Sequence, residues 1–314
     1  GKVEFEWKAV DMQVLVKADG MPTYHLANVV DDLQMRVTLV VRAEEHLPNT
    51  PKQQMIWEAL GETPPEWAHV PVLVNEARKK LSKRRDKVAL EMYKDEGYLP
   101  EAMRNYLMTL GWSNGDDIEI RPWDDIVRLF SLADVNHSPA FFDIKKLDAF
   151  NGEYIRAMSP HQFLEACRPW LLAESAPYPV DRFDEHTFLA MAPVIQPRCS
   201  TLADAPGLVD FLFLPDPVLD PADWAKATST PESVAVLRET IDAYETCSEW
   251  SAEPLKAVLD EIAATHGLKA GKAQAPVRVA VTGRSVGPPL FDSLALLGRA
   301  ETMRRLRGAA ATLG

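Results

Sequence analysis

The sequence has few cysteines and no long apolar run. Cys167, Cys199 and Cys247 stand far apart and form no Cys-x-x-Cys pair. A scattered, odd-numbered set argues against a disulfide framework and a cysteine-rich zinc site, and it favours reduced thiols. No apolar run approaches the roughly 20 residues of a membrane-spanning helix, and residues 1–7 lack the apolar core of a signal peptide. These absences predict a cytoplasmic protein with no membrane partner.

Positive charge is also scarce. The chain of 314 residues carries 34 Lys and Arg against 46 Asp and Glu, which gives a net charge of −12. Taken alone, this balance argues against a nucleic-acid partner, because phosphate contacts need cations. The basic residues are clustered, however, in residues 78–87 and near the C-terminus, where Arg299, Arg304, Arg305 and Arg307 lie. Net charge constrains solubility more than local binding, so a basic binding site remains open.

Residues 78–87 hold seven basic residues in ten, with Ser82 among them. Lysine ammonium groups and a hydroxyl suit the binding of phosphate oxygens whose charge changes during a reaction. The alternative is a solvated charge run. Residues 69–74 upstream are typical of a buried strand, and the spacing from Val88 onward predicts a helix. A loop that leaves the end of a strand favours a nucleotide site.

The order of predicted elements indicates two architectures in one chain. Apolar runs predict strands at 11–17, 37–41 and 70–74, with helices from residue 23 and over 51–61 between them. This alternation is typical of a doubly wound α/β sheet with parallel strands. From residue 160 onward, amphipathic spacing interrupted by prolines predicts a helical bundle whose two parts meet near residue 220.

Several long motifs resemble those of class I aminoacyl-tRNA synthetases, in the form of bacterial glutamyl-tRNA synthetases. Lys-Leu-Ser-Lys-Arg at 80–84 resembles the second signature loop of that class. Further motifs match at the family spacing at 19–32, 42–53, 97–102, 105–107, 278–284 and 296–298. The resemblance implies an ATP- and Mg²⁺-dependent ligase that activates L-glutamate at its α-carboxylate and transfers it to the 3′ end of tRNA(Glu), working as a monomer.

The resemblance also implies a domain plan. Residues 1–87 would be the second half of a Rossmann-like class I catalytic domain, and residues 88–159 a mainly helical stem-contact fold. Two helical subdomains, 160–219 and 220–314, would together form an all-α anticodon-binding domain. The first signature of the class, of the type His-x-Gly-His, does not occur in these 314 residues. We therefore expect a fragment without the N-terminal half of the catalytic domain, unable to activate glutamate alone.

Three sets of residues match functional positions of the family. Tyr24, Asn28 and Arg42 match the amino-acid pocket, where an arginine fork suits a carboxylate. Arg42 directly follows the predicted strand 37–41, which favours a ligand-facing role over a surface charge. The ATP-site positions are Glu45, His46, Leu73, Lys80, Ser82, Lys83 and Arg84, of which the last four would stabilise the phosphates during adenylate formation. No residue is expected to hold a metal ion.

The third set would contact the anticodon. It consists of Arg198, Arg278, Gly287, Pro288 and Leu290. Arginine suits this role because its planar guanidinium stacks on unpaired bases and forms hydrogen bonds with them. A surface or loop role is the alternative for each residue, and residues 287–289 also fit a simple turn. Two other functions stay open at this point: a noncatalytic tRNA-binding module, and an acidic helical scaffold without RNA.

Overall fold

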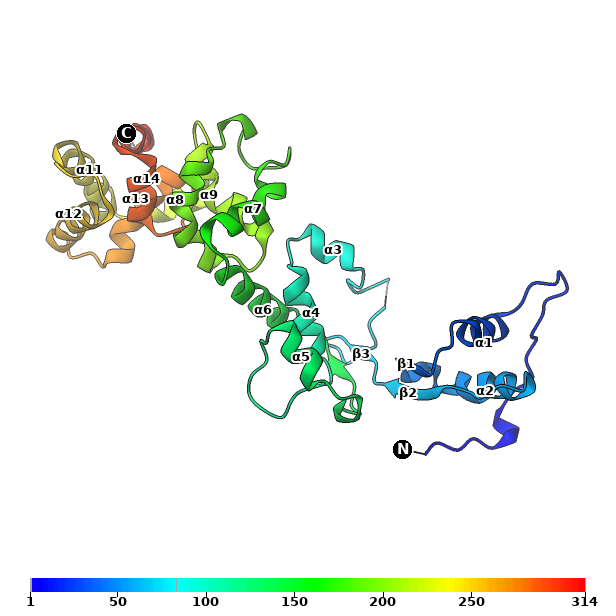
Figure 1. The fold of residues 1–314 in the computed structure, drawn as a ribbon. Coiled ribbons are helices and arrows are strands. Elements are labelled where there is room, and N and C mark those ends of the chain that lie inside the picture. The colour runs from blue at the N-terminus through cyan, green and yellow to red at the C-terminus, as the bar shows by residue number, and fades with distance from the viewer. Residues whose placement is uncertain (1, 83, 314) are drawn as a thin grey trace. The chain divides into compact units, whose positions relative to one another are not determined.

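The computed structural model describes residues 2–82 and 84–313. The chain divides into two compact units, whose helices and strands are labelled in Figure 1. The first comprises Gly1–Ala89 and Arg104–Ile144, and the second comprises Leu90–Met103 and Lys145–Gly314. The stretch 88–159, expected to be one stem-contact fold, is thus divided between the units. The expected domain limits at 87, 159 and 219 remain predictions.

The first unit is organised around a strand–helix–strand element. Strands β1 (Leu39–Ala43) and β2 (Glu66–Val70) pair in parallel, and Arg42 lies opposite His69. The connection between them contains the 3₁₀ helix η2 (Glu44–Asn49) and the helix α2 (Thr50–Ala59). Helix α1 (Tyr24–Gln34) packs on α2 around Val29, Ile56 and Trp57. This small core fixes α1 and α2 on the strand that carries Arg42.

A second pair of parallel strands lies in the same unit. β3 (Leu73–Val74) pairs with β4 (Ala140–Phe141), which is distant in sequence. Four elements lie between these strands in sequence. The helices α3 (Leu90–Asp95) and α4 (Pro100–Met108) belong wholly or partly to the second unit, whereas α5 (Trp123–Leu129) and the 3₁₀ turn η3 (Leu132–Asp134) belong to the first. The basic loop therefore begins at the end of β3 and ends at α3, as predicted.

The strand predictions need three corrections. Residues 11–17 form no strand beyond a single bridge between Val16 and Pro22, because their apolar side chains lie outside the core and are largely exposed. The strand expected at 37–41 runs over Leu39–Ala43, so that Arg42 lies within it and not after it. The strand expected at 70–74 is broken in two, because Pro71 has no N–H to donate to a ladder.

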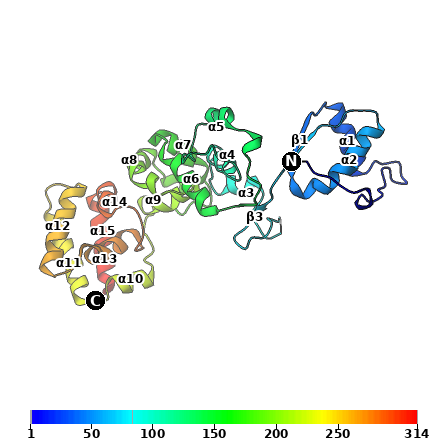
Figure 2. The same ribbon diagram turned by 90° about the horizontal axis from the view of Figure 1, so that it is seen from below.

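The second unit is helical and has two hydrophobic cores. The first core is built by the helices α6 (Ile144–Arg156), α7 (Pro160–Leu171), α8 (Glu185–Ile195) and α9 (Ala205–Phe213). The second is built by α10 (Pro221–Ala227), α11 (Pro231–Thr246), α12 (Ala252–Thr265), α13 (Ala270–Thr282), α14 (Leu290–Leu297) and α15 (Arg299–Ala310). Figure 2 shows α11 to α15 gathered as one group.

Local sequence signals explain where several of these helices begin. Ser159 accepts a hydrogen bond from the Gln162 backbone, and the Gln162 side chain bonds back to the Ser159 N–H, which forms a capping box at α7. The predicted helix start at 159–160 is confirmed. Helix α14 joins the two cores, because Leu294 is buried in the second core while Leu296 packs against the first. In the described part of the chain, no helix is long and apolar enough to span a bilayer.

Candidate substrate site and RNA-binding surface

Arg42 is a firmly anchored charged side chain of the first unit. Its Nε–H donates to His69 Nε2 at 3.2 Å, Nη1 donates to Gln53 Oε1 at 2.7 Å, and Nη2 donates to Thr50 Oγ1 at 2.8 Å. The guanidinium also lies over the Trp67 ring, 4.9 Å from its centroid. These contacts fix the plane of the guanidinium from three sides.

The partners of Arg42 come from positions that the fold aligns. Thr50 and Gln53 are one helical turn apart on α2, so they face the same way. Gln53 is fully buried, and its Nε2 donates to Asn28 Oδ1 on α1 at 2.7 Å. Asn28 is therefore connected to Arg42 through Gln53. The structure brings these two sequence-predicted pocket residues into one hydrogen-bond network.

Two titratable groups near Arg42 respond to its charge. Burial lowers the pKa of His69, and the positive charge of Arg42 lowers it further, which favours the neutral imidazole, whose Nε2 can accept the Arg42 N–H. Burial raises the pKa of Asp32, with a further rise from the Asp31 charge, while Arg42 opposes both. Burial also lowers the pKa of Arg42 itself, against the influence of Tyr24 and Asp32. Arginine nonetheless stays charged at any physiological pH.

The anchored guanidinium is suited to bind a carboxylate. Its three hydrogen bonds use three of the five N–H donors of arginine, and the described residues provide no hydrogen-bond partner for the other two. A carboxylate could accept both in a bidentate pair. Tyr24, 57% exposed, lies close enough to influence the pKa of Arg42. Two of the three predicted amino-acid-site residues, Asn28 and Arg42, thus share a hydrogen-bond network, and Tyr24 influences Arg42 through its charge.

The basic loop has a defined internal structure. The Asn75 side-chain oxygen accepts from the backbone N–H groups of Ala77 and Lys79, and Asn75 Nδ2 donates to Asp86 Oδ1 at 3.1 Å. Asp86 Oδ2 accepts from the Ser82 N–H at 2.8 Å, and this bond is the main reason why the pKa of Asp86 lies below its usual value. Asn75 and Asp86 thus close the loop at its two ends.

Most of the described cations of the loop are exposed. Lys80 Nζ pairs with the Glu45 carboxylate on η2, so two predicted ATP-site residues meet. His46, beside Glu45, is half-exposed, and its Nδ1 is hydrogen-bonded to Asn49 Nδ2. The other predicted ATP-site residues are placed as follows. Leu73 lies in β3, the Ser82 hydroxyl oxygen accepts a hydrogen bond from Arg85 Nε, and Arg84 is exposed. Lys83 lies outside the described residues. Among those residues, no group of three or more His, Cys, Asp or Glu side chains could hold a metal ion.

The predicted anticodon residues lie in the second unit. Arg278 on α13 donates from Nη1 to the Pro288 carbonyl at 2.5 Å, and Gly287 borders the same guanidinium. Burial lowers the pKa of Arg278, and the nearby charge of Arg198 lowers it further. Arg198, on the 3₁₀ turn η5 (Gln196–Arg198), is exposed. Three of the five predicted residues, Arg278, Gly287 and Pro288, therefore lie together, and the charge of Arg198 is felt at Arg278.

Leu290 differs from the other four. Its side chain is only 2% exposed and belongs to the second core, so it is unable to stack on a base. Its backbone lies at the start of α14, where N–H groups are available to acceptors. The arginines near the C-terminus also fail to add to a basic surface. Arg299 donates a hydrogen bond to the Cys247 carbonyl, and Arg307 forms an ion pair with Glu245. Both side chains are therefore engaged in contacts within the chain.

Comparisons with known proteins connect these sites to one family. Residues 1–149 match the catalytic domain of class I tRNA synthetases (E and Q), and residues 162–310 match an anticodon-binding domain. A glutamate–tRNA ligase of Salinispora tropica is 54% identical over 313 residues, which are 98% of this chain and 67% of the relative. The chain belongs to the glutamate–tRNA ligase family. The predicted fold class, a class I catalytic part followed by a helical anticodon domain, is confirmed.

Other members of the family show the same extent of similarity. A glutamate–tRNA ligase of Thermobifida fusca is 59% identical over 98% of this chain, and the match covers 65% of the relative. A crystal structure of a glutamate tRNA ligase from Elizabethkingia meningosepticum, in complex with its amino acid, has a TM-score of 0.79 and 31% identity over 98% of this chain and 63% of that one. The chain thus spans about two thirds of the length of its relatives.

Sequence reasoning missed the residues that hold Arg42. Thr50 and Gln53 lie at helical spacing in the motif 42–53, and this spacing was a usable signal. His69 and Trp67 gave none, because their place beside Arg42 depends on the register between β1 and β2.

Proposed function

We propose that the protein to which this chain belongs is a glutamate–tRNA ligase. It activates L-glutamate with ATP and transfers the glutamyl group to the 3′ end of tRNA(Glu). The observation that carries this proposal is the Arg42 guanidinium, held by His69, Gln53 and Thr50 with two N–H donors left for a carboxylate of the substrate. Family membership supplies the reaction class, and this site supplies a physical basis for the choice of an acidic amino acid.

In this proposal the basic loop binds the nucleotide. The ATP phosphates compete with the Glu45 carboxylate for Lys80, and Ser82, Lys83 and Arg84 add donors as charge develops on the α-phosphate. Mg²⁺ enters with the ATP, because the described residues offer no cluster that would hold it independently. His46, Glu45 and Leu73 border the nucleotide. The protein works as a cytoplasmic monomer.

The test is glutamate-dependent exchange of pyrophosphate into ATP by the full-length protein. Gln53→Leu removes the buried link between Asn28 and Arg42, and we expect the KM for glutamate to rise about 10-fold while the KM for ATP changes little. Gln54→Leu is the matched control, since Gln54 is the exposed neighbour whose side chain bonds Glu58 on the same helix. No exchange in the unsubstituted protein, or equal effects of both substitutions, would refute the proposal.

A second function concerns the 314-residue chain itself. Arg198 and Arg278 favour RNA binding by the helical unit, whereas the sequence contains no first signature motif of the class. We infer that this chain binds tRNA(Glu) without activating glutamate. Salt-dependent binding in fluorescence anisotropy, together with no pyrophosphate exchange by this chain, is the expected outcome. Salt-insensitive or absent binding would favour a helical scaffold without an RNA role.

A further inference from the structure

The proposed anticodon surface is assembled from two parts of the helical unit. Arg198 follows α8 of the first core, whereas Arg278 and Pro288 belong to α13 and the start of α14 in the second core. Burial lowers the pKa of Arg278, and the like charge of Arg198 lowers it further, so the charges of these two residues repel each other. Helices α8 and α14 pack together between them. Since like charges disfavour this arrangement, other contacts must hold the two cores in place.

One such contact comes from the loop that carries Gly287 and Pro288. Arg284, in this loop, makes a two-pronged ion pair with Asp210 on α9, at 2.8 Å from Nη1 and 2.6 Å from Nη2. Arg284 Nη2 also donates to the Gly207 carbonyl. Asp210 is 8% exposed, so water screens the pair only partly. Arg284 therefore connects the second core directly to α9 of the first.

The rest of the loop is also held. The Thr282 hydroxyl donates to the carbonyls of Arg278 and Arg284, and the Ser285 N–H donates to Asp223 Oδ2 at 2.7 Å. The Arg278 side chain then bonds Pro288 at the far end of the loop. A movement of Arg284 would therefore pass through a short and well-bonded segment to Gly287 and Pro288.

We propose that Arg284 is a positioning residue for anticodon recognition: its ion pair with Asp210 sets the spacing between Arg198 on one core and the Arg278–Pro288 edge on the other. Arg284 acts through these residues and does not contact RNA itself. This inference rests on the proposed tRNA-binding function. Loss of the pair should reduce discrimination between anticodons more than general affinity for RNA, because the general affinity depends on cations that remain in place.

The test is tRNA binding by the 314-residue chain and its Arg284→Gln variant. The probes are a tRNA(Glu) transcript and the same transcript with exchanged anticodon bases, compared by fluorescence anisotropy at one salt concentration. We expect the ratio of the two Kd values to fall about 3- to 10-fold in Arg284→Gln. The Kd for the altered transcript should stay unchanged. Arg284→Lys, which keeps the charge but loses the fork, should give an intermediate ratio.

Arg168→Gln is the matched control. Arg168 has the same side-chain exposure as Arg284, 34%, and pairs with Glu165 and Glu185, but all three lie on α7 and α8 of one core. It should keep the ratio of the unsubstituted chain. Full discrimination in a folded Arg284→Gln variant, verified by circular dichroism, would overturn this inference alone. Equal binding of both transcripts by the unsubstituted chain would overturn the proposed anticodon recognition and this inference with it.

Discussion

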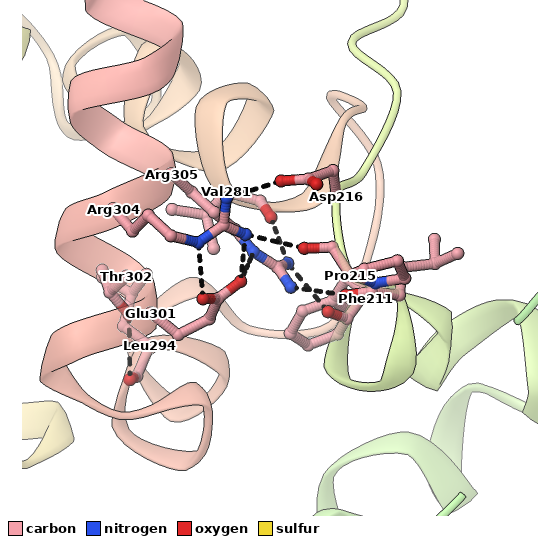
Figure 3. Close-up of polar contacts among 10 residues, drawn as sticks. Phe211, Pro215, Asp216, Val281, Leu294, Glu301, Thr302, Arg304 and Arg305 are labelled. Carbon is pink, nitrogen blue, oxygen red and sulfur yellow. Dashed lines mark hydrogen bonds and ion pairs between the residues drawn. The ribbon is translucent and has the colours of Figure 1, made fainter. Parts of the chain in front are cut away.

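Replacing Arg305 by Met should strongly destabilise the helical unit. Arg305 on α15 is 5% exposed and donates to the carbonyls of Phe211, Val281 and Leu214 at 2.8, 2.9 and 2.9 Å. Its Nε–H donates to Glu301 at 2.6 Å. Figure 3 shows Arg305 beside Arg304, which reaches Pro215 and Asp216. Phe211 and Val281 lie in the last turns of α9 and α13, so Arg305 caps two helices at once.

The magnitude follows from what the substitution leaves behind. Methionine fills most of the volume but donates nothing, so three carbonyls lose a partner, at about 1 kcal/mol or more each where they are buried. Glu301 keeps Arg304 as its partner. The expected loss in free energy of unfolding is about 3–5 kcal/mol, a large fraction of the 5–15 kcal/mol of a typical domain.

The assay is urea unfolding followed by circular dichroism, together with hydrogen exchange in peptides that cover the ends of α9 and α13. Hydrogen exchange localises the effect, which matters because a chain with several cores need not unfold in two states. Arg307→Met is the control: Arg307 is on the same helix but 58% exposed and pairs with Glu245, so it should change stability by less than about 0.5 kcal/mol. Equal losses in both variants, or unchanged exchange at α9, would refute the reasoning.

Two further predictions concern the same region. Gly283→Ala should lower the free energy of unfolding in urea by about 2–4 kcal/mol, since Gly283 has φ +83° and an added Cβ would lie 2.5 Å from the Val218 carbonyl oxygen. Gly308→Ala is the control and should be neutral or stabilising, because an added Cβ meets open space on the helix α15. A larger loss of stability in Gly308→Ala than in Gly283→Ala would contradict the argument. Bonds from Arg304 lower the pKa of Glu301 from 4.5 to about 2, against the effect of burial. A carboxylate whose pKa is lowered in the folded state stabilises the protein fully above its unfolded-state pKa. This stabilisation is lost as the pH falls through the folded-state pKa. Glu301→Gln should therefore lower the free energy of unfolding by about 1–2 kcal/mol at pH 7. If the difference in stability between the unsubstituted chain and the variant did not narrow below pH 4, ionised Glu301 would not be the source of the stabilisation.

Much of the fold could be predicted because its signals are local. The helix that begins after Ser159 has a cap, a capping partner and a proline within four residues, all visible in the sequence. The strands were harder, because their limits depend on partners far along the chain. β3 pairs with β4, which lies more than 60 residues later in the sequence.

The candidate site shows the same division. The motifs identified Asn28, Arg42 and Lys80 by residue type and order, and the structure joins the first two through Gln53. The sequence did not distinguish arginines that face solvent from those that stabilise the fold. Arg304 and Arg305 appear in it as part of a basic cluster, yet their hydrogen bonds go to the protein itself. Burial of a charge depends on tertiary packing, which no short motif encodes.

Helix α14 bears on how members of this family can be recombined. Leu294 and Leu296, two positions apart, serve different cores, and Arg284 and Arg305 add bonds across the same junction. A chimera that exchanged residues 220–314 between two relatives would have to bring matching partners on α8 and α9. A crossover directly after residue 159 would keep all these contacts within one parent. Such hybrids should be soluble more often than hybrids joined at residue 220.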